Sequence, residues 1–354
     1  MKSKYYLPSG YIDMARIFDL PYTFIFVVHG RGTGKTFGAC KYCYDYHDRT
    51  GDKFIYLRRL QVEADLVGNT AFSPFTPVTD FYNLEPLISG PIPNVKNVKG
   101  IWKTERNEKG DLVPAGPPIG YTAALATVSS IRGFSGRDIK ICVYDEFIPE
   151  KTARPIRAEG EAVLQFYESV NRNRELEGEA PLKMVFLSNA NKLSSPVFEA
   201  FGITNYIDKM VRGKQEECYL KDRGVAILKL SDSPISRQKS KTALYKASQS
   251  EAFNDMAIGN SFDMSNYLYV RAEPIDEYRI IAKFDDVYIY RHKSEARYYV
   301  TRYRTGTPKA EYISEPFSIK KFKKDYALVF TAWIDGRISF NDYYCKLILT
   351  KALQ

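Results

Sequence analysis

The sequence lacks the features of a membrane or secreted protein. Its 354 residues contain no run of about 18 apolar residues, so we expect no transmembrane helix and no membrane partner. The positive charges at the start are not followed by an apolar segment, so we expect no secretory signal and a protein that stays in the cytoplasm where it is made. There is also no internal repeat and no low-complexity tract.

Cysteine and histidine are scarce, with five Cys and three His in the chain. The odd number and wide scatter of the cysteines favour reduced thiols. Cys40 and Cys43 form a C-x-x-C motif, but no second pair or histidine cluster completes the four ligands of a structural metal site. Both fall in an expected helix at positions i and i+3, so helix packing explains them better than metal binding does.

Acidic residues are outnumbered, with 42 Asp and Glu against 51 Lys and Arg, which gives a net charge of +9. This excess favours a polyanionic partner, although an ordinary solvated surface explains it equally well. The C-terminal third, from about residue 231, is the more basic part per residue and holds many of the 27 tyrosines.

Strands alternate with helices in the first 230 residues, which predicts an α/β fold with a mainly parallel sheet. Between its elements, residues 68–94 are rich in proline and are expected to be irregular. The expected strands are 22–28, 53–58, 95–104, 120–126, 139–144 and 182–187, and the expected helices are 36–47 and 159–175.

The pattern changes near Ser231. Polar, helix-prone residues without a strand are followed by short strands and a closing helix, which predicts a smaller α+β domain. We therefore expect an α/β domain at 1–231, a helical linker at 232–260 and a second domain at 261–354. The expected elements of the last part are strands at 267–272, 278–284, 286–292 and 296–303 and a helix at 340–352.

A glycine-rich turn joins the first expected strand to the first expected helix. It matches the phosphate-loop motif G-x-x-x-x-G-K-[ST], except that His29 stands at the first glycine position. In such a turn the backbone N–H groups surround phosphate oxygens, and the following helix adds its positive dipole end. Lys35 would reach the β- and γ-phosphates of ATP, and the Thr36 hydroxyl would hold Mg²⁺. The full turn consists of His29, Gly30, Arg31, Gly32, Thr33, Gly34, Lys35 and Thr36.

An acidic pair, Asp145 and Glu146, ends the hydrophobic strand at 139–144. Beside a phosphate loop, Asp145 would hold Mg²⁺ through water and Glu146 would polarise the attacking water. Alone, such a pair could be a surface end-cap, but the preceding phosphate turn favours catalysis. Glu directly after Asp indicates an ATPase of the additional-strand type rather than a GTPase or kinase.

Polar and basic residues near these motifs are further candidates. Asn189 ends the strand at 182–187, which lies next to the phosphate loop in such sheets, so it is either a γ-phosphate sensor or a polar strand cap. Arg172 and Arg174 end the helix at 159–175, which we expect close to the catalytic edge. They are either an arginine finger for a neighbouring subunit or a basic helix end. Arg132 either acts on phosphate or DNA or makes a structural salt bridge, and Arg58 and Arg59 end the second strand, where they could contact nucleotide or a subunit.

Several of these motifs together resemble the DNA-packaging ATPases of phi29-like bacteriophages, relatives of the large terminases. The resemblance covers roughly residues 20–200 and is faint beyond. It rests on five segments in this order: G-R-G-T-G-K-T, F-I-Y-L-R-R, V-Y-D-E-F-I, N-R-N-R-E and L-S-N-A.

This resemblance implies a ring, usually of five subunits, that uses ATP and Mg²⁺ to drive double-stranded DNA through the portal vertex of a viral procapsid. It implies that Lys35 and Thr36 bind nucleotide, that Asp145 and Glu146 are the metal and catalytic acids, and that Arg172 and Arg132 act in trans. The protein would then work in the host cytoplasm, transiently on the procapsid. A structural packaging RNA is a further partner that the resemblance suggests.

The resemblance also implies that the C-terminal domain has a ribonuclease H fold without its nuclease acids. Asp285 and Asp286 lie at a hairpin turn rather than inside the first strand, where a two-metal cluster would need an acid. We therefore expect no nuclease activity. Two alternatives stay open: a terminase-like enzyme that also cuts DNA, and a nucleotide-switched capsid assembly protein with little DNA-stimulated turnover.

Overall fold

The computed structural model describes residues 4–67, 72–93, 95–130, 136–150, 153–190, 193, 195–230, 233–248, 254, 262 and 267–353. The chain divides into two compact units, Met1–Asp263 and Met264–Gln354. Each unit has a sheet and a hydrophobic core of its own. Among the described residues, no helix is both long enough and apolar enough to cross a bilayer.

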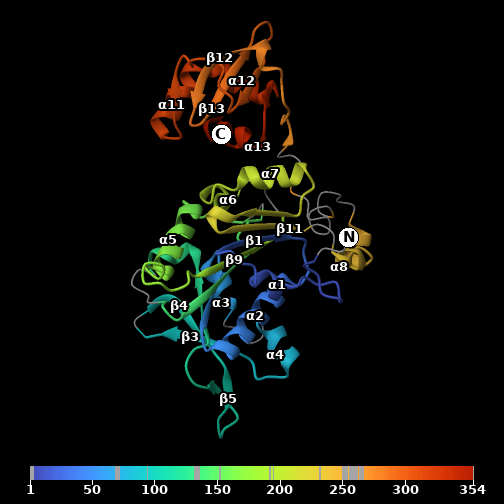
Figure 1. The fold of residues 1–354 in the computed structure, drawn as a ribbon, viewed down its shortest axis with the longest axis vertical. Helices are drawn as coiled ribbons and strands as arrows, with labels where there is room; N and C mark the ends of the chain where they lie inside the picture. Colours follow the sequence, from blue (N-terminus) through green and yellow to red (C-terminus); the bar gives the residue numbers. More distant parts are fainter. Residues whose placement is uncertain are drawn as a thin grey trace. The chain divides into compact units, whose positions relative to one another are not determined.

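The first unit is built on a nine-stranded sheet. Its strands are β1 (Phe24–His29), β2 (Lys53–Arg58), β3 (Ile88–Ile92), β4 (Val95–Trp102), β7 (Gly120–Ala124), β8 (Ile139–Asp145), β9 (Lys183–Ser188), β10 (Glu217–Leu220) and β11 (Val225–Leu230). They lie in the order β10-β11-β1-β9-β8-β2-β7-β4-β3 (Figure 1). All pairings from β11 through to β7 are parallel, and the outer strands β10, β4 and β3 pair antiparallel. The expected α/β fold with a mainly parallel sheet is confirmed.

Helices cover both faces of this sheet (Figure 1), which is why apolar residues run continuously through the middle of its central strands, as at residues 24–28 of β1 and 184–187 of β9. In β1, Ile25 and Val27 pack on one face with Ala39 and Cys40 of α2. Phe26, between them, points to the other face and stacks on Phe186. The helices of this unit are α1 (Met14–Phe18), α2 (Lys35–Thr50), α3 (Gln61–Leu66), α4 (Thr76–Tyr82), α5 (Glu159–Asn171), α6 (Pro196–Ala200), α7 (Thr204–Arg212), α8 (Pro234–Lys239) and α9 (Ala243–Ala247).

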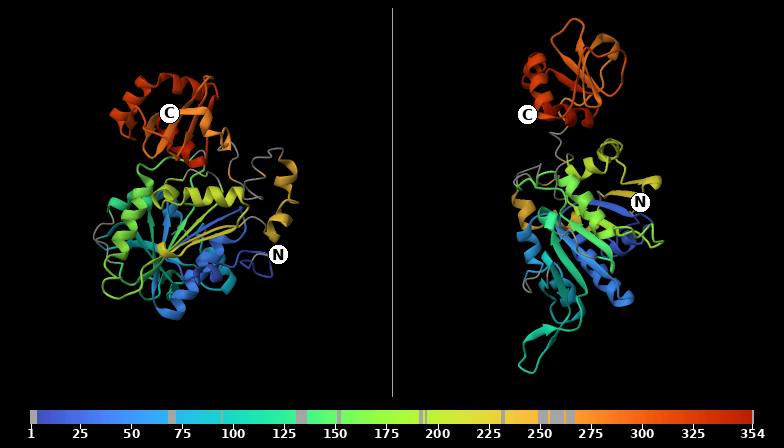
Figure 2. Two further views of the ribbon diagram at one scale, coloured as in Figure 1. Left: turned by 45° about the horizontal axis from the view of Figure 1, so that its top comes forward. Right: turned by 90° about the vertical axis from the view of Figure 1, so that its left-hand side faces the viewer.

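Several elements of the first unit differ from those expected. The Pro-rich segment at 68–94 contains α4 and β3 in its described part, because a proline at the first turn of α4 is compatible with a helix start. The strands β10 and β11 were not expected, although residues 225–230 form an apolar run. A hairpin of β5 (Thr104–Arg106) and β6 (Leu112–Pro114) forms a separate two-stranded sheet that projects from the unit (Figures 1 and 2).

The second unit is an α+β structure around a five-stranded sheet, β15-β12-β13-β14-β16. Its strands are β12 (Tyr278–Phe284), β13 (Val287–His292), β14 (Tyr298–Thr301), β15 (Glu311–Tyr312) and β16 (Ile338–Phe340), and its helices are α11 (Pro316–Asp325), α12 (Ala327–Ile334) and α13 (Tyr343–Leu353). The expected strand at 267–272 is wrong, because Val270 makes only an isolated bridge to Phe340.

Candidate functional site

The glycine-rich turn has the strand–turn–helix setting that the sequence predicts. It connects β1 to α2, and Gly32 and Gly34 have φ values of +69° and +90°. These values lie in the left-handed region that glycine adopts without steric cost. Gly34 is the N-cap of the 16-residue helix α2, whose first N–H groups have no partner within the helix and favour an anion.

His29 occupies the first glycine position of the motif without strain, because it ends β1 and has no positive φ. Its ring is fully buried, and Nε2 lies 3.0 Å from the Tyr6 hydroxyl oxygen. Burial, with the nearby Lys35 cation, lowers the pKa of His29 to about 3, so the imidazole is neutral at physiological pH. The backbone at this position therefore does not require glycine.

Lys35 is folded back onto the turn in this structure. Its Nζ donates to the carbonyl oxygens of His29 at 2.7 Å and Gly30 at 2.8 Å, and to Oδ1 of Asn189 at 3.0 Å. Burial lowers the pKa of Lys35 from 10.5 to about 7, while the nearby carboxylates of Asp145 and Glu146 act in the opposite direction. A buried lysine whose three hydrogen-bond acceptors are all uncharged is suited to an incoming anion.

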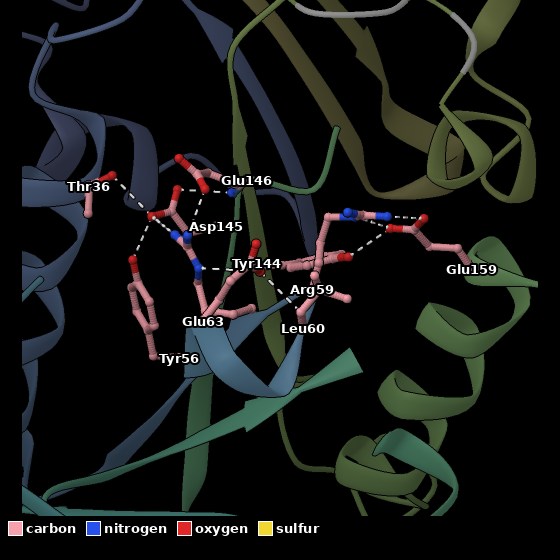
Figure 3. A network of polar contacts seen from close by, with 10 residues as sticks. Thr36, Tyr56, Arg59, Leu60, Glu63, Tyr144, Asp145, Glu146 and Glu159 are labelled. Atoms are coloured by element: carbon pink, nitrogen blue, oxygen red, sulfur yellow. Dashed lines mark hydrogen bonds and ion pairs between the residues drawn. The ribbon is translucent and has the colours of Figure 1, made fainter. Parts of the chain in front are cut away.

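Asp145 lies buried at the end of β8 and accepts hydrogen bonds from three side chains of two elements, α2 and β2 (Figure 3). Its Oδ2 accepts hydrogen bonds from Thr36 Oγ1 at 3.0 Å, the Tyr56 hydroxyl at 2.5 Å and Arg58 Nη1 at 3.1 Å. A carboxylate beside a threonine hydroxyl offers the oxygen ligands that Mg²⁺ prefers. The structure thus brings Thr36 and Asp145 together from positions 109 residues apart.

Glu146 follows with a φ of +59°, which is uncommon for a residue other than glycine. Its Oε2 accepts from Arg58 Nη2 at 2.6 Å, and its side chain is 53% exposed. Partial burial raises the pKa of Glu146, and the Arg58 cation opposes that shift. The carboxylate is thus accessible from solvent and held by one cation.

A cleft of about 330 Å³ connects these groups. It is lined by residues 31–37 of the turn and α2, by both acids, and by Ser188 and Asn189 at the end of β9. Because β9 lies between β1 and β8, the expected position of this strand next to the phosphate loop is confirmed. Its register places Asn189 within 3.0 Å of the Lys35 ammonium.

The two consecutive arginines at the end of β2, Arg58 and Arg59, have different surroundings, since successive side chains of an extended chain point to opposite faces. Arg58 donates hydrogen bonds to Asp145 and Glu146, and only the tertiary structure reveals this contact. Arg59 is buried and donates to both carboxylate oxygens of Glu159, at 2.6 and 2.9 Å (Figure 3). Arg59 is therefore paired with the start of α5 rather than with the acid pair.

The expectation that Arg172 and Arg174 lie close to the catalytic edge is wrong. Arg174 is buried and donates to the carbonyl oxygens of Ile139 and Gly136 at the beginning of β8, whereas Asp145 ends that strand. Arg174 thus joins the chain just after α5 to the beginning of β8. Arg172, an exposed C-cap of α5 with a φ of +50°, lines a pocket together with Arg174 and Arg137, near the beginning of β8. It does not reach the cleft of its own chain. Arg132 lies outside the described residues.

Asp285 and Asp286, at the turn between β12 and β13, accept hydrogen bonds from other parts of the second unit. Asp285 accepts from the backbone N–H of Ser314 at 2.8 Å and from its hydroxyl, and Asp286 accepts from the Tyr344 hydroxyl at 2.9 Å. Across the part of the chain that the structure describes, no three Asp, Glu, His or Cys side chains gather as metal ligands would.

The glycine-rich turn follows β1, the acid pair follows β8, and β9 lies between these two strands in the sheet. This arrangement is typical of P-loop nucleotide-binding proteins. Comparison with known families is more specific. Residues 1–83 and 115–345 match the family described as podovirus DNA encapsidation protein (Gp16). The chain belongs to this family.

The individual relatives named here share no more than 24% of the aligned residues with this chain. The DNA packaging protein of Bacillus phage PZA is 24% identical over 277 residues, which span 78% of this chain and 71% of that protein. The DNA packaging protein of Bacillus phage B103 is 21% identical over 338 residues, 91% of this chain and 94% of that one. A chain of the bacteriophage phi29 viral genome packaging motor assembly has 18% identity and a TM-score of 0.65, covering 97% of this chain and 99% of that chain. That similarity shows a shared fold.

Proposed function

We propose that this protein is an ATPase that drives double-stranded DNA into a viral procapsid as a ring, of about five subunits, at the portal vertex. The observation that carries the proposal is the 3.0 Å contact between Thr36 and Asp145, beside Lys35 and Glu146 in one cleft. Membership of a DNA encapsidation family supports the DNA substrate. The net charge of +9 is consistent with a polyanionic partner.

The residues of the cleft fit a nucleotide and a magnesium ion. Gly34 turns its backbone where a Cβ would approach the Tyr11 ring to 3.1 Å, and the unpartnered N–H groups that follow suit phosphate oxygens. Thr36 and Asp145 would hold Mg²⁺, which when bound would neutralise charge on the phosphate oxygens. Residues 30–36 would surround the phosphates.

The remaining roles follow from the positions of the side chains. Lys35 would exchange its carbonyl acceptors for phosphate oxygens, and Asn189, already bonded to Lys35, would respond to the γ-phosphate. Glu146 would orient and polarise the attacking water once its carboxylate leaves Arg58. In-line attack depends mostly on positioning and electrostatics, which these fixed groups supply.

Arg172 is proposed to act in trans. It lies at the edge of the sheet opposite to the cleft of its own chain, so it can approach a phosphoryl group only in a neighbouring subunit. A cation supplied in this way neutralises charge on the transferred phosphoryl group. Arg132 keeps the same proposed role on the basis of sequence alone.

For the second unit, we propose a ribonuclease H-like fold without nuclease activity. What supports it is the antiparallel meander of β12, β13 and β14, with β15 added parallel to its first strand. Asp285 and Asp286 are engaged by Ser314 and Tyr344 at the hairpin. Contacts to the portal, and to a packaging RNA if one is used, would come from basic surfaces, and the protein would act in the host cytoplasm and on the procapsid.

Steady-state ATP hydrolysis, with and without long double-stranded DNA and over a range of protein concentrations, tests the proposal. We expect stimulation by DNA that rises more steeply than protein concentration, in the presence of procapsids if the ring forms only there. Lys35→Ala should abolish turnover. Lys41→Ala, which removes a partly exposed lysine of the same helix that pairs with Asp45 and does not line the cleft, should preserve it. DNA-indifferent turnover even with procapsids would favour a nucleotide-switched assembly protein instead.

A further inference from the structure

The segment that follows β11 returns to the phosphate loop. Because β11 is parallel to β1, its carboxyl end lies at the same edge of the sheet as the loop. Residues 233–248, with α8 and α9, belong to the first unit and precede the second unit in the chain. We call residues 233–248 the connector. Lys239, the last residue of α8, has no part in the nucleotide site described so far.

Lys239 contacts the outer side of the phosphate loop. Its Nζ donates to the carbonyl oxygen of Arg31 at 2.8 Å. A Cβ at Gly32 would lie only 2.7 Å from the same Nζ, so the absence of a side chain at Gly32 makes room for the ammonium. The Lys239 cation also lies 5.5 Å from the centre of the buried Tyr245 ring, which orients it from the connector side.

A second contact fixes the beginning of the connector. Ser233 Oγ donates to the carbonyl oxygen of Gly10 at 3.1 Å, and a Cβ at Gly10 would come within 2.9 Å of the Pro234 side chain. Two residues later, the backbone N–H of Ile12 donates to the carbonyl oxygen of Thr33 in the loop at 3.0 Å. The connector is therefore bound to the phosphate loop directly through Lys239, and indirectly through residues 10–12, which contact both Ser233 and Thr33.

The contact with Arg31 has a geometric consequence for phosphate binding. The peptide bond between Arg31 and Gly32 is trans, so its C=O and N–H point in opposite directions. With the carbonyl held by Lys239 on the outer side, the Gly32 N–H is directed away from Lys239, and Gly32 also lines the cleft. The lysine thus stabilises the loop conformation in which this N–H is available to an anion.

We propose that Lys239 is a positioning residue of the phosphate loop, so that nucleotide binding and docking of the connector are thermodynamically linked. This inference rests on the proposed nucleotide binding. By reciprocity, whatever favours the docked connector tightens nucleotide binding, and bound nucleotide holds the connector in place. Binding of nucleotide to the phosphate loop thereby stabilises the docked position of the connector, which precedes the second unit in the chain.

Binding of ADP by the full-length protein, measured by calorimetry, provides the first test. Lys239→Ala should weaken binding about tenfold, because one charge-assisted hydrogen bond no longer orders the loop. Lys239→Arg, which keeps a cation and sufficient reach, should restore most of the affinity. The matched control Lys241→Ala removes an exposed lysine two residues along and should leave affinity unchanged. An equal loss in Lys241→Ala would attribute the effect to net charge and overturn the proposal.

Backbone amide hydrogen exchange of the wild-type protein, with and without ADP, tests the linkage directly and does not depend on a variant that folds. Exchange in residues 233–248 should slow about tenfold when ADP binds, and Lys239→Ala should lose that protection. Protection of the loop amides without any change in the connector would overturn the linkage. Absence of ADP binding in the wild type would instead refute the proposed function, so the two failures are distinguishable.

Discussion

Nucleotide binding should be accompanied by proton uptake at Lys35. The pKa of this lysine is lowered to about 7 by burial in the free protein. A phosphate group in contact with Nζ favours the cation and raises that pKa. At about pH 8, roughly nine-tenths of Lys35 would be neutral before binding, so close to one proton should be taken up per nucleotide. At about pH 6 the lysine is already charged, and uptake should be close to zero.

The sign of the pH dependence follows from the same shift. Since the bound state holds the extra proton, affinity should fall as pH rises above 7, by about tenfold per pH unit, until the pKa of the bound state is reached. His29 cannot produce this effect, because with a pKa of about 3 it remains neutral throughout this range.

Calorimetry of ADP binding in two buffers with different ionisation enthalpies measures the number of protons directly. Lys35→Arg is the control, because a guanidinium stays charged over this range. It should bind with no proton uptake. Uptake below about 0.2 proton at pH 8 in the wild type, or equal uptake in Lys35→Arg, would refute the reasoning that burial neutralises Lys35.

Three further predictions concern catalysis and stability. Glu146→Gln should retain ADP binding and lower ATP turnover about 10²–10⁴-fold; normal steady-state turnover would remove Glu146 from the role of base. Arg172→Ala should lower DNA-stimulated turnover about 10³-fold, and doping it into wild type should inhibit more than dilution does; inhibition proportional to dilution would argue against action in trans. Glu159→Ala should destabilise the first unit by about 3–5 kcal/mol in urea unfolding, because it leaves the buried Arg59 cation unpaired. Arg106→Ala, which breaks the exposed pair of Arg106 and Glu85, is the matched control. If the urea midpoint of Glu159→Ala is no lower than that of Arg106→Ala, the buried ion pair of Arg59 and Glu159 does not stabilise the unit as proposed.

The sequence alone was sufficient for elements whose signal is local. An apolar run followed by glycines, Lys35 and Thr36 predicts β1, the turn and α2, because glycine conformation and helix dipole act within a few residues. The strand ending at Asp145 could be recognised in the same way. Short elements were predicted less well, because too few residues show a period: β15 was not expected, and the segment at 267–272 was wrongly predicted to be a strand.

Long-range contacts explain what sequence reasoning missed. The buried pairing of Arg59 with Glu159 and the contact of Arg58 with Glu146 join residues roughly 90–100 positions apart. Two consecutive arginines look alike in a sequence, and only the strand geometry directs Arg58 to the acid pair and Arg59 to α5. Arg174 was misplaced for a related reason, because the direction of α5 across the sheet cannot be read from its composition.

The sequence by itself determined which side chains are candidates to hold phosphate, to hold a metal ion and to activate water in the proposed function. The tertiary structure decided where these groups meet and what restrains them. Parallel pairing of β1, β9 and β8 brings Lys35, Asn189 and Asp145 to one edge, and α8 adds Lys239 to the outer side of the loop. Local motifs are fixed by backbone sterics over a few residues, whereas these contacts exist only after distant strands have paired and their helices have packed.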